Sequence, residues 1–283
     1  MSNMSITTAQ VNPSIALFGA TGGTGLAILN EILSSSSTTH LNVLCRTPSK
    51  LSQFSNKTIY PNLHIIQGDI RDATALKSAL IDPATNLPVD IVVSSLGMTL
   101  IRSSTFSMKW SDPTLCQDGV KNILSTLDSL EVEHGPKNVK TKVIVVSTTG
   151  ISRKGRDIPC KMRPLYSLGK TPFEDKIRME EEIVRWAGEG EGKRWMAVRP
   201  SLLINGEAKR TVVKIGWEFP GAADRKSEDE RENDVVEKTE EGEDKLEIGY
   251  QITRGGVGKW IYEEGIRNGG RSEWEGRFMS LTY

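Results

Sequence analysis

The feature that most constrains the fold of this chain is a glycine-rich turn between an apolar run and a helical pattern. Ile15 to Phe18 form a short apolar run, typical of a strand buried on both faces. Gly19, Gly22 and Gly25 follow at a G-x-x-G-x-x-G spacing, and the apolar residues after them recur at helical intervals. Strand, glycine turn and helix in this order form the context of a dinucleotide-binding fingerprint. The alternative is a glycine-rich turn in an unrelated α/β protein.

Each glycine of this motif has a physical reason in a dinucleotide site. Gly19 allows the tight turn, Gly22 lets the backbone approach a diphosphate, and Gly25 lets the helix pack closely on the strand. The diphosphate would bind backbone N–H groups at the positive end of the helix dipole. The cofactor-binding residues expected in this segment are Gly19, Thr21, Gly22, Gly23, Thr24 and Gly25.

The residue after the second predicted strand indicates which dinucleotide would bind. Leu41 to Cys45 form that strand, and Arg46 follows it, 21 residues after Gly25. In NAD-binding folds an acidic residue about 20 residues beyond the glycines accepts hydrogen bonds from the ribose 2′-hydroxyl. An arginine there suits the 2′-phosphate of NADP instead, and Lys50 would add charge. We therefore predict NADP(H) as the cofactor, the alternative being a solvated Arg46.

The rest of the chain alternates between strand and helix patterns. Further strands are expected at 63–67, 90–93, 142–146 and 195–198, and helices at 73–81, from Pro113 to Leu130, and at 255–266. This rhythm predicts an α/β fold: a Rossmann-type, doubly wound parallel sheet with helices on both faces and a small C-terminal substrate-side portion. Ligands of such sheets bind beyond the carboxyl ends of the strands. We therefore expect the segments at these strand ends to meet in one crevice: the glycine turn, Arg46, Asp69, Ser95–Gly97, Ser147–Thr149 and Pro200–Leu202.

Composition limits the classes of function. Lys and Arg total 36, as do Asp and Glu, so no net field favours nucleic acid or a membrane surface. Cys45, Cys116 and Cys160 lack metal-ligand spacing, so we expect free thiols, a reducing compartment and no metal. No apolar stretch approaches the ~18 residues of a membrane-spanning helix. Without a signal-peptide pattern at residues 1–14, these features predict a cytoplasmic protein.

The expected domain organisation is a flexible tail at 1–13 followed by a single NAD(P)-binding domain at 14–283. A stretch at about 222–245 is dominated by charged residues. Such a composition cannot bury enough apolar surface to become ordered, so we expect a flexible charged insertion.

The chain resembles the short-chain dehydrogenase/reductase superfamily, and specifically its atypical NmrA-like branch. The resemblance is carried by Gly19–Gly25, Gly68–Asp69, Ser147–Thr148 and Val198–Leu203. The segments Leu246–Ile248 and Thr253–Trp260 look like those of fungal oxidoreductases of the averufin oxidase A type. The resemblance implies further cofactor contacts: Asp69 and Ile70 at the adenine, Leu96 and Gly97 at the adenosine, Ser147 and Thr148 after the fifth strand, and Pro200 and Leu202 at the nicotinamide.

The superfamily's usual catalysts are a Tyr and a Lys spaced Y-x-x-x-K, with an earlier Ser. The Tyr gives a proton to a carbonyl, and the Lys lowers the pKa of the Tyr and holds the ribose. Tyr166, Lys170 and Ser147 match this set and are the catalytic candidates. However, Thr171–Glu174 reads as a capping box with Pro at the first helical position, which would start the helix after both residues. Asp175–Lys176 with Glu180 resembles the NmrA-like pattern, which requires no Tyr–Lys pair.

These features predict an NADP(H)-dependent oxidoreductase that transfers a hydride to or from a small organic carbonyl, quinone or polyketide-like aromatic. The NmrA-like branch also includes proteins without catalytic activity. The alternative is therefore an NAD(P)-binding redox sensor that acts through a protein partner. A cofactor-independent isomerase or cyclase is a third, weaker possibility.

Overall fold

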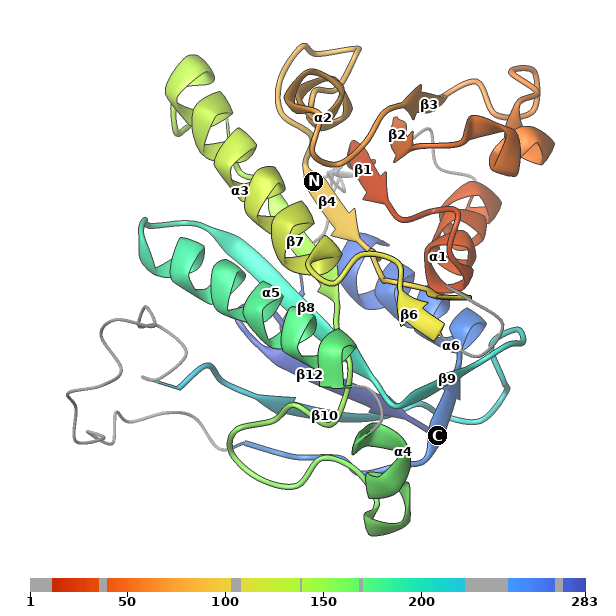
Figure 1. Ribbon diagram of the computed structural model, residues 1–283. Coiled ribbons are helices and arrows are strands. Elements are labelled where there is room, and N and C mark those ends of the chain that lie inside the picture. Colours follow the sequence, from red (N-terminus) through yellow and green to blue (C-terminus); the bar gives the residue numbers. More distant parts are fainter. Residues whose placement is uncertain are drawn as a thin grey trace, which may run out of the picture.

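A central sheet flanked by helices organises the computed structural model (Figure 1). The structure describes residues 12–35, 40–102, 108–137, 139–167, 170–221, 244–267 and 272–283. In these ranges the sheet has eight strands in the order β10-β12-β8-β7-β4-β1-β2-β3. Their bounds are β1 Ile15–Phe18, β2 Leu41–Cys45, β3 Leu63–Gln67, β4 Ile91–Ser94, β7 Lys142–Val146, β8 Arg194–Pro200, β10 Lys214–Glu218 and β12 Phe278–Thr282.

All neighbouring strands of the sheet are parallel except β10 and β12, which are antiparallel. The order reverses at β1, where Ile15 pairs with Leu41 of β2 on one side and Ile91 of β4 on the other. Such a reversal opens a crevice at the carboxyl ends of the strands. The expected Rossmann-type fold is confirmed.

Helices cover both faces of the sheet (Figure 1). Apolar residues of α1 and α6 pack on one face, and those of α2, α3 and α5 on the other. The helices are α1 Gly23–Ser34, α2 Ala73–Leu80, α3 Leu115–His134, α4 Arg163–Ser167, α5 Lys170–Gly188 and α6 Arg254–Trp260, with 3-10 turns at Pro48–Phe54 and Cys160–Met162 and a π-helical turn at Ile261–Ile266. Every residue of β1, β2 and β7 is buried, because both of their faces are covered.

None of the described helices has the length and apolar character needed to cross a bilayer.

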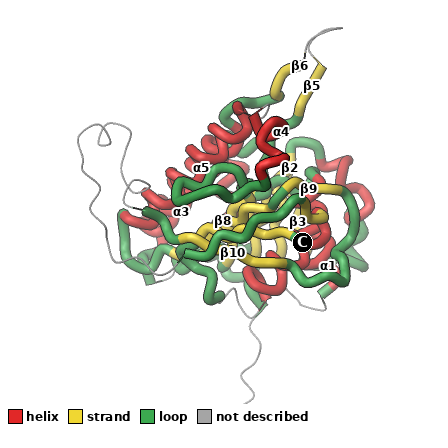
Figure 2. The backbone as a smooth tube through the Cα atoms, turned by 90° about the horizontal axis from the view of Figure 1, so that it is seen from below, coloured by secondary structure: helices red, strands yellow, loops and turns green. Residues whose placement is uncertain are grey.

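Two small sheets lie outside the central one. The hairpin of β5 (Leu100–Arg102) and β6 (Met108–Trp110) projects from the body of the molecule, as Figure 2 shows. The other pairs β9 (Leu202–Ile204) with β11 (Gln251–Thr253) in parallel.

The structure corrects several boundaries that the sequence predicts. The helix expected at 255–266 begins at Arg254 and becomes π-helical after Trp260. Strands β5, β6, β9, β10 and β12 had no counterpart in the expected pattern. The predicted tail at 1–13 and insertion at 222–245 lie outside the described residues, apart from 12–13 and 244–245. At 244–245 the chain is held to β10, because Lys245 and Trp217 exchange backbone hydrogen bonds of 2.8 and 2.6 Å.

One fully buried lysine lies at the amino end of the sheet. Lys142 starts β7, and its Nζ lies 3.4 Å from the Gly265 carbonyl oxygen and 3.8 Å from Glu275 Oε1. Arg194 also donates to Glu275, through Nε at 3.0 Å and Nη2 at 2.7 Å. Burial lowers the pKa of Lys142 to about 8, although Glu275 opposes this shift. At neutral pH the fold therefore holds an ammonium group that has lost its water.

Lys142→Met should raise the free energy of unfolding at pH 7 by about 1–3 kcal/mol, since it removes a desolvated charge and leaves Glu275 paired with Arg194. Between about pH 8 and 10 the folded wild-type protein gives up this proton while the unfolded chain keeps it. The difference in free energy of unfolding between the variant and the wild-type protein should therefore become smaller as the pH rises. Urea denaturation at pH 7 and 9.5 measures the difference, with the exposed Lys140→Met as control. A difference that does not change with pH would contradict the prediction.

Candidate functional site

The crevice at the reversal point holds a pocket of about 230 Å³ at the carboxyl ends of β1 to β4. The structure brings together in it ten residues expected from the sequence: Gly19, Thr21, Gly22, Arg46, Lys50, Asp69, Ile70, Ser95, Leu96 and Gly97. Other lining residues, among them Cys45, Thr99, Ser111 and Leu115, were not expected.

The glycine turn folds tightly against its own helix. Gly19 has a φ of +82°, and a Cβ there would lie 2.4 Å from the Ser95 carbonyl oxygen. A Cβ at Gly25 would lie 2.2 Å from the Gly19 carbonyl oxygen, so the first turn of α1 rests directly on the end of β1. Only glycine fits these two positions.

The backbone conformation of Gly22 does not require glycine, although a Cβ there would be tight against the preceding turn. Its φ of −88° and ψ of 160° suit any residue, and the nearest neighbour of a Cβ would be the Gly19 oxygen at 3.3 Å. Helix α1 has no side-chain cap on Gly22 and no acidic residue in its first turn. Its first N–H groups therefore remain for an anion, and the turn fits a dinucleotide diphosphate.

Positive charge lies at the end of β2. The Arg46 side chain is 69% exposed, and its Nε lies 4.0 Å from Asp69 Oδ2 at the end of β3. Lys50 is exposed and lines the same pocket. Asp69 is itself fixed, since its Oδ1 accepts a hydrogen bond of 3.0 Å from the Arg71 N–H. The two cations are therefore free to meet a ligand phosphate at the rim.

The base of the β5–β6 hairpin forms one wall of the pocket. The Ser111 N–H donates to the Thr99 carbonyl at 2.8 Å, and Ser111 Oγ accepts from the Thr99 N–H at 3.0 Å. Arg71 anchors this base by donating to Asp112 and Asp118, each at 2.7 Å. The Arg71 hydrogen bonds lower the pKa of Asp112, so the anchor is ionic at neutral pH. No sequence signal indicated this wall, because strands of three residues carry no readable periodicity.

A lysine on α5 links the two halves of the crevice. Lys176 Nζ donates to the carbonyl oxygens of Leu96, after β4, and Val146, at the end of β7, at 2.8 and 2.6 Å. The same ammonium also forms a hydrogen bond with the Cys116 side chain. Nearby, the Ser147 N–H donates to the Val198 carbonyl at 2.6 Å, and its buried Oγ has no hydrogen-bond partner among the described residues. The sequence contained Lys176 in a family-like pattern but did not mark it as a site residue.

The structure separates Tyr166 from Lys170. Tyr166 lies in α4, where its hydroxyl is 3.1 Å from Thr149 Oγ1 and its ring stacks on Phe173. Lys170 is the first residue of α5, is 83% exposed, and pairs with Glu174 at 3.7 Å. Helix α5 begins at Lys170 itself, whereas the capping box predicts a start just after this residue. Burial raises the pKa of Tyr166, and the hydrogen bond from Thr149 only partly opposes this.

The other expected residues are not among those that line this pocket. Thr24 and Gly25 are buried in the first turn of α1, and Gly23 lines a neighbouring pocket. Thr148 is half-buried after β7. Pro200 is buried at the end of β8, whereas Leu202 is 39% exposed on β9.

The Cys45 and Cys116 thiols border the crevice, and both have low reactivity. Burial raises the pKa of Cys45, and it raises that of Cys116 to about 11. Both therefore stay protonated near pH 7 and are poor nucleophiles. Among the described residues, no cluster of His, Cys, Asp and Glu has a geometry that could hold a metal ion.

Comparison with known proteins agrees with this geometry. Residues 19–230 match the NAD(P)H-binding family. Reductase pytE of Aspergillus terreus is 34% identical over 288 residues, covering 96% of this chain and 98% of that protein. Averufin oxidase A of Dothistroma septosporum is 35% identical over 127 residues, or 44% of this chain and 40% of that protein.

A solved structure supports the fold at lower identity. ChuY, an anaerobillin reductase from Escherichia coli O157:H7, superposes with a TM-score of 0.56 at 14% identity, covering 95% of this chain and 96% of that chain. The glycine turn, the reversal at β1 and the full-length relative all lead to one assignment. This chain belongs to the NAD(P)H-binding family and is an oxidoreductase of the atypical short-chain dehydrogenase/reductase type.

Proposed function

We propose that this protein is an NADP(H)-dependent oxidoreductase of the NmrA-like branch that acts on a small organic carbonyl, quinone or polyketide-like aromatic. The observation that carries the NADP preference is Arg46 at the end of β2. It takes the position at which NAD-specific folds have a carboxylate, and Lys50 lines the pocket beside it. Asp69 orients the guanidinium from 4.0 Å and leaves most of it exposed to a 2′-phosphate.

The nicotinamide cofactor would supply or accept the hydride, and the residues of this chain would bind and orient the cofactor and the substrate. The glycine turn and the start of α1 bind the diphosphate, and the Lys176 ammonium suits a ribose hydroxyl. Tyr166, Ser147 and Lys170 remain the catalytic candidates. The surroundings of Lys176 favour it over Lys170 for the role of the lysine, since Lys170 points to solvent. Burial raises the pKa of Tyr166, which weakens the phenol as an acid, so its role as proton donor requires a positive charge nearby to lower that pKa.

Apolar surface near the crevice supports a hydrophobic substrate. Leu100 and Ile101, on the hairpin that forms the pocket wall, are 48% and 39% exposed. The relatives named as a reductase and an averufin oxidase support turnover of a small molecule. A sensor acting through a protein partner would bind the cofactor but oxidise no NADPH with any carbonyl or quinone. Following NADPH absorbance across a panel of quinones and aldehydes distinguishes the two functions.

Arg46→Asp should erase or invert the preference for NADP(H) over NAD(H). One charge-assisted phosphate contact contributes about 1.5–3 kcal/mol, or about ten- to a hundredfold in affinity. Titration of both cofactors by fluorescence measures the two dissociation constants. Arg178→Asp, at an exposed position on α5, is the control for the change in charge. Equal affinities for the two cofactors in the wild-type protein would defeat the proposal.

Lys176→Met and Lys170→Met form a matched pair, six residues apart on one helix. The change at Lys176 should weaken NADPH binding about tenfold or more, because it removes a charged donor from the crevice. The change at Lys170 should leave affinity within about twofold, because only a solvent-exposed ion pair is lost. A larger loss of NADPH affinity in Lys170→Met than in Lys176→Met would show that Lys170, the lysine of the Y-x-x-x-K spacing, binds the cofactor.

Tyr166→Phe should lower turnover by about 10²- to 10⁴-fold while NADPH affinity is unchanged, because the ring stays and only the proton donor is removed. Steady-state kinetics on any accepted substrate, with the cofactor dissociation constant measured separately, test this. A wild-type rate would remove Tyr166 from the mechanism.

A further inference from the structure

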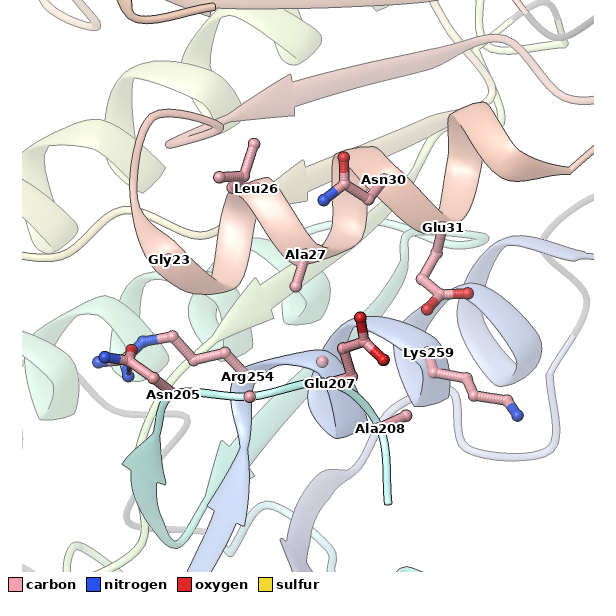
Figure 3. Close-up of a pocket in the computed structure, with 12 residues that line it drawn as sticks. Gly23, Leu26, Ala27, Asn30, Glu31, Asn205, Glu207, Ala208, Arg254 and Lys259 are labelled. Carbon is pink, nitrogen blue, oxygen red and sulfur yellow. Dashed lines mark hydrogen bonds between the residues drawn. The ribbon is translucent and has the colours of Figure 1, made fainter. Parts of the chain in front are cut away.

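A second pocket lies on the outer side of α1, beside the glycine turn. It has a volume of about 590 Å³ and lies between α1, residues 205–208 and the start of α6 (Figure 3). Arg254 and Asn205 lie together near Gly23 at one end of this pocket, whereas Glu31 and Lys259 lie toward the other end (Figure 3). The Arg254 end therefore adjoins the first turn of α1.

Gly23 is an additional glycine that the G-x-x-G-x-x-G spacing does not require. A Cβ at Gly23 would lie 2.5 Å from Arg254 Cδ and 2.7 Å from its Nε. The Arg254 side chain thus crosses the first residue of α1 where any other residue would displace it. Gly23 makes room for this arginine.

Arg254 is positioned by the chain on both sides of it. It follows β11, whose Thr253 pairs with Ile204 of β9 and caps α6 by accepting a 3.0 Å hydrogen bond from the Gly256 N–H. Its Nη1 donates to Asn205 Oδ1 at 2.8 Å. Across the described ranges, no carboxylate forms an ion pair with Arg254. Its charge therefore has neutral partners but no counter-charge.

We propose that Arg254 is a cofactor-binding residue that contacts the diphosphate of NAD(P)H, opposite the backbone N–H groups of the glycine turn. The proposal rests on NAD(P)H binding by this family and is independent of the preference for NADP. The first turn of α1 has no acidic residue, so the helix end and the guanidinium both favour an anion at Gly23. A guanidinium fork matches the geometry of phosphate oxygens. Elsewhere the pocket is lined by Glu31, Glu207 and Lys259, so charges of both signs are present there, whereas, of the described residues, Arg254 is the only charged one that lines the Gly23 end.

Two ligand fragments test the contact without catalysis. 2′-Phospho-ADP-ribose carries the diphosphate but no nicotinamide, and 2′-AMP carries no diphosphate. Arg254→Gln should weaken binding of the first about ten- to a hundredfold in isothermal titration and leave binding of the second within about twofold. Lys259→Gln, at the other end of the same pocket, should change neither affinity. Unchanged binding of 2′-phospho-ADP-ribose, or an equal loss for both fragments, would overturn the proposal.

A double-mutant cycle tests whether Gly23 acts through Arg254. Gly23→Ala should weaken 2′-phospho-ADP-ribose binding in the wild-type background and much less in the Arg254→Gln background. Equal losses in both backgrounds would show that Gly23 does not act through the arginine. If Arg254→Gln does not fold, Arg254→Lys keeps the charge without the fork and should give an intermediate loss. Repeating the titrations with ADP-ribose separates this proposal from NADP preference, because the Arg254 effect should persist there and the Arg46 effect should disappear.

Discussion

The arrangement of the sheet and its helices depends on one buried guanidinium. Arg199 of β8 donates to Glu180 of α5 at 2.8 and 2.6 Å and to Glu218 of β10, and it lies 4.1 Å from the Phe278 ring of β12. All three charged side chains are at most 6% exposed. Burial raises the pKa of Glu218, and Arg199 only partly opposes it, so each carboxylate depends on this arginine. Removing one member of such a group costs about 3–5 kcal/mol, because it leaves a buried charge uncompensated. Helix α5 is thereby fixed to three strands at once.

Two consecutive residues of α5 then organise the crevice. Asp175 accepts 2.9 Å hydrogen bonds from the N–H groups of Cys116 and Gln117, and so caps α3 from a neighbouring helix. Lys176 joins the ends of β4 and β7. The side of the crevice beyond β4 is therefore set by a helix on one face of the sheet, whereas the glycine turn sets the other side. A shift of α5 would move both the α3 cap and the lysine.

The sequence predicted those features of the fold that depend on residues close to one another along the chain. The apolar run Ile15–Phe18 and the glycine spacing after it lie within a few residues of each other, and the structure has both as expected. The capping box, which is also local, predicted a helix start just after Lys170, and α5 begins at Lys170 itself. The roles of Lys176 and Arg254 were not readable, since they depend on the phase of α5 against the sheet and on contacts between residues distant in sequence. The five-residue strands β10 and β12 lack a distinctive pattern, and their antiparallel pairing departs from the βαβ rhythm.

The position of β12 has a consequence for how the chain acquires its structure. β10 reaches the rest of the sheet through β12, although about sixty residues separate these strands in sequence. During synthesis β10 therefore leaves the ribosome before the strand that will hold it, and β8 is until then the open edge of a parallel sheet. Trp195 to Val198, buried in the finished protein, would offer an apolar edge to other nascent chains. The insertion of β12 gives strand partners to both β8 and β10, so it is the step that completes this side of the sheet.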